Sequence, residues 1–227
     1  MNTVSQYAKA WGMEKVPVWF LDDRICRETI QLGYPELLPH FDAELHGPFK
    51  GDICRTVALH LTGGYYFDVD LEVIKPYTVP NDVGFVTANP GNEKELFQAF
   101  IASEPGSLVL STALDAMVSF YQTPAHARIG RNLGPITLYE SLLAVEAKLG
   151  KYELLEEISL NDSSLYPELP RRPGEGCCCN NVVHDPLKKE VHFYSSVVGA
   201  SSFCKTPGTM FDPIQQLAEE AHATTNV

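Results

Sequence analysis

Two aspartates separated by one residue end a short aromatic run, and their types and spacing could do chemistry. Asp68 and Asp70 follow Tyr65-Tyr66-Phe67, a segment typical of a buried strand. Alternate side chains of a strand point the same way, and two neighbouring carboxylates repel each other unless a cation lies close. Such oxygen ligands suit Mg²⁺ or Mn²⁺. The pattern predicts a divalent metal site, and a turn with two exposed aspartates is the simpler alternative.

A second charged pair lies in the segment just before that strand, which the pattern predicts to be a helix. Asp52 and Arg55 are three residues apart, so their side chains are neighbours on a helix. At 100° per residue they lie opposite an apolar face. That face consists of Ile53, Cys54, Val57, Ala58 and Leu61. On spacing alone, an ion pair on a helix surface explains Asp52 and Arg55 equally well.

Other elements must position these residues, and their order indicates the fold class. Strands interleaved with helices predict an α/β fold with a largely parallel sheet. Residues 152–160 are compatible with a strand or a helix extension, and residues 161–181 with a long loop. The expected helices span residues 23–33, 48–62, 107–121 and 134–149, and the expected strands span 16–20, 65–67, 83–88 and 191–195. Gly63-Gly64 should end the second helix, because glycine accepts the left-handed conformation.

Length and charge limit the class of protein. The chain has 227 residues, of which 44% are hydrophobic and 20% charged, which fits a soluble globular protein and excludes collagen, coiled coil and wholesale disorder. We expect one domain over residues 1–227, with a core at about 5–200 and a tail at 206–227. The net charge of −12 repels phosphate backbones, so no nucleic-acid partner is expected. A phosphorylated substrate would need a local cation.

Cysteine spacing and hydropathy add little about compartment. The six cysteines form no CxxC pair, which argues against a zinc ribbon or finger. The run Cys177-Cys178-Cys179 is interpreted as a loop whose thiols are free or partly paired. No apolar stretch of about 18 residues is present, and the first six residues lack a signal core. The compartment therefore stays open.

The motif as a whole resembles a known family. Asp52-x-x-Arg55 followed by Gly63-Gly64-Tyr65-Tyr66-Phe67-Asp68-x-Asp70 is similar to the DXD glycosyltransferases of the glycosyltransferase 32, Och1-like and capsular polysaccharide synthesis type. The large clostridial glucosylating toxins share this core. The resemblance covers roughly residues 5–145, including Asp22-Asp23 and Gly134-Pro135. It implies a GT-A-like fold and retaining transfer of a hexose from a UDP- or GDP-sugar to a glycan, lipid or other hydroxyl acceptor.

The resemblance also assigns roles to residues. Asp68 and Asp70 match the catalytic aspartates, which would hold Mn²⁺ or Mg²⁺ against the donor diphosphate. The metal would neutralise the diphosphate and stabilise charge on the leaving nucleotide. The positions that match donor-binding residues are Asp52, Arg55, Gly64 and Tyr66.

Two features of the family have imperfect counterparts here. Relatives open with a strand of the Ile-Pro-Lys-Ile-Ile-His-Gln-x-Trp type, which touches the nucleotide base, and this sequence offers no such segment. Relatives also close with a histidine that helps to bind metal. The nearest match is His192 in Val191-His192-Phe193-Tyr194, which we predict as a metal ligand. A strand histidine with a backbone partner is the alternative.

Two other functions compete with transfer. A sugar-binding relative could keep the fold and lack turnover. A haloacid-dehalogenase-type phosphatase would use Asp68 as phosphoryl acceptor and Asp70 as acid/base, although Leu71-Glu72 departs from its motif. Eukaryotic members of the family work in the Golgi lumen behind a membrane anchor and bacterial members in the cytoplasm. Membrane contact is thus expected only through an anchor outside this sequence.

Overall fold

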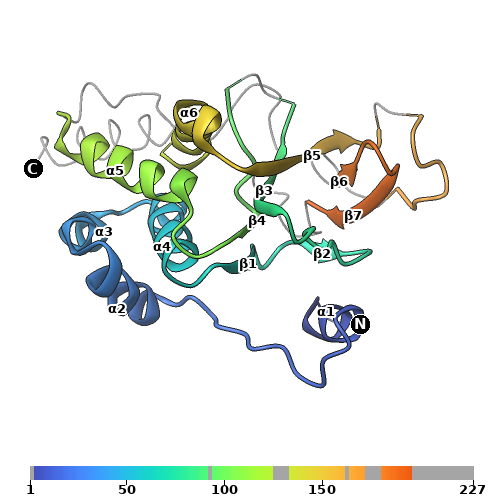
Figure 1. Ribbon diagram of the computed structural model, residues 1–227, viewed down its shortest axis with the longest axis horizontal. Helices are drawn as coiled ribbons and strands as arrows, with labels where there is room; N and C mark the ends of the chain where they lie inside the picture. The colour runs from blue at the N-terminus through green and yellow to red at the C-terminus, as the bar shows by residue number, and fades with distance from the viewer. Residues whose placement is uncertain (1–2, 92–93, 125–132, 162–163, 172–179, 196–227) are drawn as a thin grey trace, which may run out of the picture.

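The computed structural model describes residues 3–91, 94–124, 133–161, 164–171 and 180–195. They form a mixed α/β structure with one seven-stranded sheet (Figure 1). The helices are α1 (Thr3–Ala10), α2 (Asp23–Gly33), α3 (Leu38–Ala43), α4 (Gly47–Thr62), α5 (Leu108–Gln122) and α6 (Gly134–Val145), with 3-10 turns at Pro35–Leu37 and Glu146–Lys148. The strands are β1 (Gly64–Phe67), β2 (Glu72–Val73), β3 (Val83–Asn89), β4 (Phe100–Ser103), β5 (Lys151–Ser159), β6 (Asn181–Asp185) and β7 (Glu190–Tyr194).

The sheet is mostly antiparallel, so the prediction of a largely parallel sheet is wrong. Its strand order is β1-β4-β3-β5-β6-β7-β2, and among the described strands the β3–β5 pair is the one parallel pair. The chain passes from β3 to β5 through β4, α5 and α6, whereas β6 and β7 are joined directly as a hairpin. Direct connections produce antiparallel neighbours, and the sequence pattern did not reveal them.

The helices begin and end close to the predicted residues. The Asp22 carboxylate caps α2 by accepting a 2.7 Å hydrogen bond from the backbone N–H of Ile25. α4 ends at Gly63, whose φ of 62° lies in the left-handed region. A Cβ on Gly63 would also lie 2.9 Å from the Ser103 carbonyl oxygen. Both the backbone conformation and the close packing therefore require glycine at this position.

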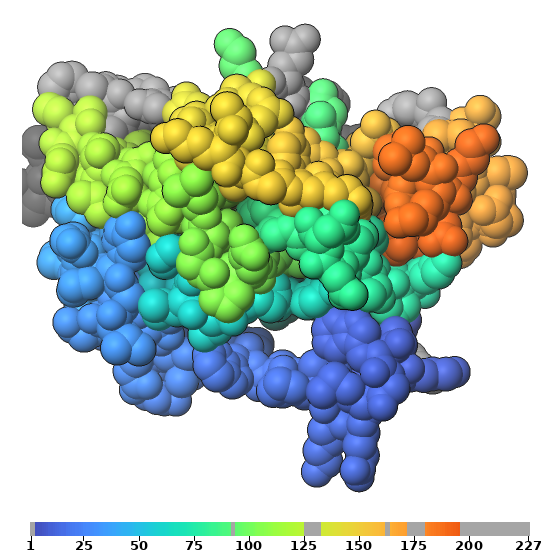
Figure 2. Space-filling view, viewed as in Figure 1, coloured from blue at the N-terminus to red at the C-terminus, as the bar shows by residue number. Residues whose placement is uncertain are grey.

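The predicted strand over residues 16–20 does not form. The segment between α1 and α2 has no strand partner in the part of the chain that the structure describes, and Val18, Trp19 and Phe20 are 57%, 66% and 73% exposed. Five elements were not predicted: α1, α3, β2, β4 and β6. α1 packs on β1 through Tyr7, whose ring centroid lies 5.2 Å from that of Phe67. The N-terminal residues project below the body of the molecule (Figure 2).

A disulfide joins α2 to α4 inside a helical core. Cys26 and Cys54 are bonded across a sequence separation of 28 residues, amid apolar side chains from α2, α3, α4 and α5. By the chain-entropy relation, closing a loop of this length stabilises the fold by roughly 3–4 kcal/mol. The sequence did not predict this pairing.

The Cys177-Cys178-Cys179 run and the tail at 206–227 lie outside the described residues. No helix within the described ranges is long and apolar enough to cross a membrane.

Candidate functional site

Arg55 is the centre of a buried polar cluster where α4 meets the end of β1. Its side chain is 9% exposed, and Nη1 lies 3.1 Å from Asp68 Oδ1 while Nη2 lies 3.7 Å from Asp52 Oδ1. The guanidinium also donates from Nε to the Gly51 carbonyl at 3.1 Å. Burial alone lowers the pKa of Arg55, but Asp52 and Asp68 raise it overall, so the cation is maintained. The interpretation of Arg55 as part of a surface ion pair is wrong.

Tyr66 completes the surroundings of the cation. Its ring centroid lies 4.8 Å from Arg55 Cζ, and its hydroxyl donates a short hydrogen bond to Asp68 Oδ1. Tyr66 is on β1, so the strand supplies the aromatic face and, one residue past its end, the carboxylate. Burial raises the pKa of Tyr66, which keeps its hydroxyl a donor toward Asp68.

Asp52 also faces the start of α6. The backbone N–H of Gly134 hydrogen-bonds the Asp52 carboxylate, and a Cβ on Gly134 would lie 2.3–2.5 Å from the carboxylate atoms. Leu133, at the N-cap of α6, has no polar side chain to offer, so Asp52 supplies the cap from α4. Burial raises the pKa of Asp52 to about 7, and Asp68 adds to the rise while Arg55 opposes it. Asp52 can therefore exchange a proton near neutral pH.

Asp68 and Asp70 follow β1 in a turn rather than within the strand. The Asp68 side chain is 30% exposed, and Asp70 is classed as exposed. Desolvation and the negative charge of Asp68 raise the pKa of Asp70, which indicates that the two carboxylates lie near one another. Arg55 thus lies between two carboxylates, Asp52 and Asp68, and Asp70 is close to Asp68.

Gln98 is a residue of this cluster that the sequence analysis missed. Its backbone carbonyl accepts a 2.9 Å hydrogen bond from Arg55 Nη1. Its side chain is 7% exposed, and both amide atoms lack a hydrogen-bond partner among the described residues. An unpaired buried amide is energetically costly and is expected to be satisfied by a ligand or by water. A single glutamine carries no motif, and its proximity to Arg55 depends on the β3–β4 connection.

Gly64 and His192 have clear structural surroundings. Gly64 has a φ of 99°, which favours glycine. A Cβ there would meet no atom within 4 Å, so the backbone conformation and not the packing requires glycine.

His192 lies on β7 with Nδ1 3.1 Å from the Lys75 carbonyl oxygen, while Nε2 is buried without a partner in the described structure. Burial lowers the pKa of His192, which favours the neutral ring that a metal ligand requires. Its assignment as a ligand stays a prediction.

The donor set at β1 fits a hard divalent cation without forming a complete cage. Within the described ranges, no group of three or more His, Cys, Asp and Glu side chains is arranged to hold a metal. Mg²⁺ and similar ions are commonly held by one or two carboxylates together with substrate phosphates and water. Asp68 and Asp70 supply two carboxylates with excess negative charge, which is the chemistry that such an incomplete site needs.

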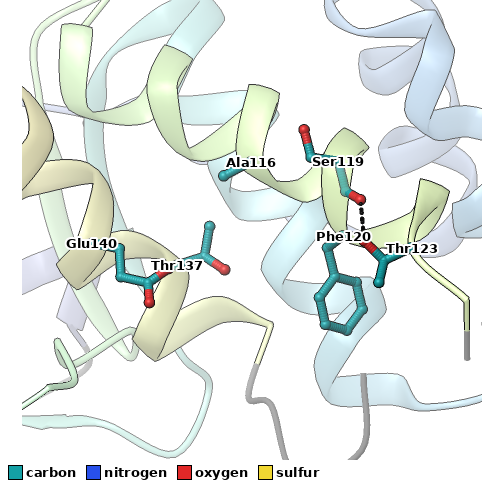
Figure 3. Close-up of a pocket in the computed structure, with 6 residues that line it drawn as sticks. All are labelled: Ala116, Ser119, Phe120, Thr123, Thr137 and Glu140. Atoms are coloured by element: carbon teal, nitrogen blue, oxygen red, sulfur yellow. Dashed lines mark hydrogen bonds between the residues drawn. The ribbon is translucent and has the colours of Figure 1, made fainter. Parts of the chain in front are cut away.

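Two other regions with polar side chains lie outside the Arg55 cluster. A hollow of about 260 Å³ lies between α5 and α6 (Figure 3). It is lined by Ala116, Ser119, Phe120, Thr123, Thr137 and Glu140, none of which belongs to the Arg55 cluster. On β6, His184 Nδ1 lies 2.8 Å from the Tyr166 hydroxyl, and Asp185 accepts from the backbone N–H of Leu187 and Lys188 at 2.9 Å and 3.0 Å.

No protein-family model matches the chain, and no curated protein matches it. Among solved structures, the chain is similar to one titled PaToxG glycosyltransferase, with a TM-score of 0.40 and 21% sequence identity. The match covers 54% of this chain and 44% of that one, so this chain spans less than half of its length. A likeness at this level carries no conclusion about activity, which must be argued from the Arg55 cluster.

Proposed function

We propose that the protein is a GT-A-like glycosyltransferase that moves a hexose from a UDP- or GDP-sugar to a hydroxyl acceptor on a glycan or lipid. The observation that carries this proposal is the buried Arg55 cation between Asp52 and Asp68, with Asp70 beside it at the end of β1. A buried cation with surplus carboxylates is costly to maintain, and such arrangements cluster at functional sites.

Each residue has a role that follows from its surroundings. Asp68 and Asp70 are the proposed ligands of Mn²⁺ or Mg²⁺, which when bound would neutralise a donor diphosphate and stabilise the leaving nucleotide. Arg55 fixes the position of Asp68 through their 3.1 Å contact. The unpartnered amide of Gln98 offers one donor and one acceptor group to sugar hydroxyls. The acidic chain thereby acquires affinity for a diphosphate through a bound metal.

The test is thermal unfolding with UDP- and GDP-sugars in the presence and absence of Mn²⁺. Ligand at 100-fold its dissociation constant should raise the melting temperature by about 5–10 °C for a chain of this size, but only when metal is present. Asp70→Ala should abolish the shift while retaining the fold. Asp82→Ala is the matched control, because Asp82 is a 68% exposed aspartate that pairs with Lys151 on the surface. A full shift in Asp70→Ala would refute the metal assignment.

The two alternatives predict different outcomes. A binding relative without turnover would show the metal-dependent shift but no hydrolysis or transfer of the donor. A haloacid-dehalogenase-type phosphatase would release phosphate from simple esters through an aspartyl phosphate at Asp68. That reaction needs a free nucleophilic carboxylate, whereas Asp68 contacts Arg55 and accepts a hydrogen bond from Tyr66. Transfer is therefore the preferred function.

A further inference from the structure

The linker between α1 and α2 exposes a continuous run of apolar side chains, here called the apolar strip. It consists of Val18, Trp19 and Phe20, which are 57%, 66% and 73% exposed. The linker is stretched along the lower side of the molecule between the two helices (Figure 1). Exposed apolar side chains that occur singly are ordinary, whereas several large ones in a row indicate a surface that contacts another molecule.

The backbone of the linker is unpaired as well. Among the described residues, no backbone N–H or C=O of residues 14–19 has a backbone hydrogen-bond partner. The Phe20 carbonyl accepts one such bond, from the Asp22 N–H at 3.0 Å. Valine, tryptophan and phenylalanine are strand-forming residues. The strip therefore has the side chains and the free backbone groups of an unpaired strand, which is a template for pairing with another chain.

Both ends of the linker are attached to the body of the molecule. On the α1 side, Gln6 Nε2 donates to the Val73 carbonyl at 2.9 Å. The Tyr7 hydroxyl accepts a 3.1 Å hydrogen bond from the Tyr77 N–H. On the α2 side, the disulfide of Cys26 joins the helix to α4. Because both ends are fixed, the strip is held in place in the solvent, and pairing with another strand costs less conformational entropy.

A second copy of the chain is the partner that fits the strip. Two copies that pair as antiparallel strands about a two-fold axis place one residue opposite itself. With Trp19 on that axis, Val18 lies opposite Phe20 of the second copy. The apolar side chains of each copy then meet apolar side chains of the other along the whole strip.

Charges at the ends of the linker favour this register. It places Lys15 opposite Asp23 of the second copy. Asp23 pairs with Lys50 at 2.7 Å within its own chain, but its side chain is 77% exposed, so a second cation can approach it. A shift of the axis by one residue toward the N-terminus would instead place Glu14 opposite Asp22. Opposite charges across a strand pair stabilise it and like charges destabilise it.

Pro17 is compatible with the same register. Proline has no backbone N–H, so it fits a strand pair at positions that make no hydrogen bond to the partner. If Trp19 occupies such a position on the axis, Pro17 does as well, because the two kinds of position alternate along a strand. Val18 and Phe20 then exchange the backbone hydrogen bonds, and the two Trp19 residues approach to a Cα–Cα distance of about 4.5 Å.

We propose that the apolar strip is a dimer interface, at which two copies of the chain pair as antiparallel strands about a two-fold axis at Trp19. The strip is short, so the dimer is weak and depends on protein concentration. The net charge of −12 on each chain repels the copies at long range, and salt screens this repulsion, so added salt should strengthen the dimer. Dimer formation is independent of the proposed transferase activity.

Sedimentation velocity of the full chain over a concentration series tests the proposal. Free thiols are first alkylated with iodoacetamide, so that no disulfide between chains contributes. Wild type should shift from monomer to dimer as its concentration rises. Trp19→Glu places two carboxylates opposite each other on the axis and should raise the Kd of the dimer at least about tenfold. Leu187→Glu is the matched control, because Leu187 is a 94% exposed leucine in the turn between β6 and β7, and the Kd should not change.

Cysteine cross-linking tests the register. The cysteines outside the Cys26–Cys54 bond are first replaced by serine, namely Cys177, Cys178, Cys179 and Cys204. With oxidised glutathione as the oxidant, Trp19→Cys should then form a disulfide between two copies, because directly opposed residues lie within the Cα–Cα range of a disulfide, about 4.4–6.8 Å. Val18→Cys is the control, because Val18 does not lie opposite itself in this register and should not cross-link.

Several results would overturn the proposal. A wild-type chain that stays monomeric over the whole series has no such interface, and an equal rise in Kd for Leu187→Glu would show that the strip has no special role. Cross-linking of Val18→Cys in place of Trp19→Cys would exclude the axis at Trp19. Flotation of the wild type with phosphatidylcholine vesicles that Trp19→Glu loses, without any dimer, would assign the strip to a lipid surface instead.

Discussion

The Arg55 cluster and the charged turn between β6 and β7 contain the same kinds of residue but differ in how completely their groups are paired. Asp185 accepts from two backbone N–H groups and lies 2.8 Å from Lys188 Nζ, and its pKa is lowered by these partners despite some burial. Around Arg55, the two carboxylates of Asp52 and Asp68 share one cation, and the amide of Gln98 has no described partner. A fully paired group stabilises a turn, whereas an incompletely paired one is suited to a ligand.

The largest contrast should come from removing the cation in each region. Arg55→Met leaves Asp52 and Asp68 without their partner in a buried environment and should lower the free energy of unfolding by about 3 kcal/mol. Lys188→Met removes a side chain that is 54% exposed, so the loss should stay below about 1 kcal/mol. Urea denaturation of both variants measures the difference. Equal losses would remove the distinction between the two regions.

A smaller effect should follow from crowding the Asp52 contact. In Gly134→Ala the new methyl group would meet the Asp52 carboxylate, which must shift, and we expect a loss of about 2 kcal/mol. Gly47→Ala is the control, because a Cβ at this position near the start of α4 meets no atom within 4 Å. Urea denaturation should find the control nearly neutral. A neutral Gly134→Ala would mean that α6 moves freely relative to Asp52.

The smallest effect concerns pH. A carboxyl whose pKa rises on folding, as that of Asp52 does to about 7, contributes stability that is greatest below its unfolded pKa and is lost as the pH rises through the folded pKa. Wild type should therefore lose about 1 kcal/mol relative to Asp52→Asn between pH 6 and pH 8. Metal-free denaturation at each pH measures this difference. Parallel profiles would indicate that Asp52 stays ionised throughout.

Signals within a few residues were read correctly from the sequence. Asp22 marks the start of α2 and Gly63 the end of α4, as predicted, because a capping carboxylate and a left-handed glycine act locally. The motif also placed Asp52 and Arg55 on one helix and Asp68 after a strand, and the structure brings these three together. Their burial could not be predicted from helical spacing, because it is produced by β4 and α6.

Contacts between distant segments were not readable from one sequence. β4 and β6 became strands through pairing with neighbours, and Gln98 reached Arg55 across 43 residues. The disulfide between Cys26 and Cys54 is one of many possible pairings, because six cysteines allow 15 complete connectivities. The sequence alone could not select it. The aromatic strand expected at residues 16–20 failed for the same reason: strand propensity needs a partner, and none is present among the described residues.

The location of β1 at one border of the sheet has a practical consequence. Its backbone is paired with β4 on one side, and the aromatic rings of Tyr7 and Trp11 rest on Tyr65. Deleting α1 would uncover the rings of Tyr65 and Phe67 on β1, whose second edge has no strand partner among the described residues, and such an exposed edge is prone to pair with other chains. A shortened protein should therefore self-associate through this border, and oligomer formation would block the surface next to Asp68.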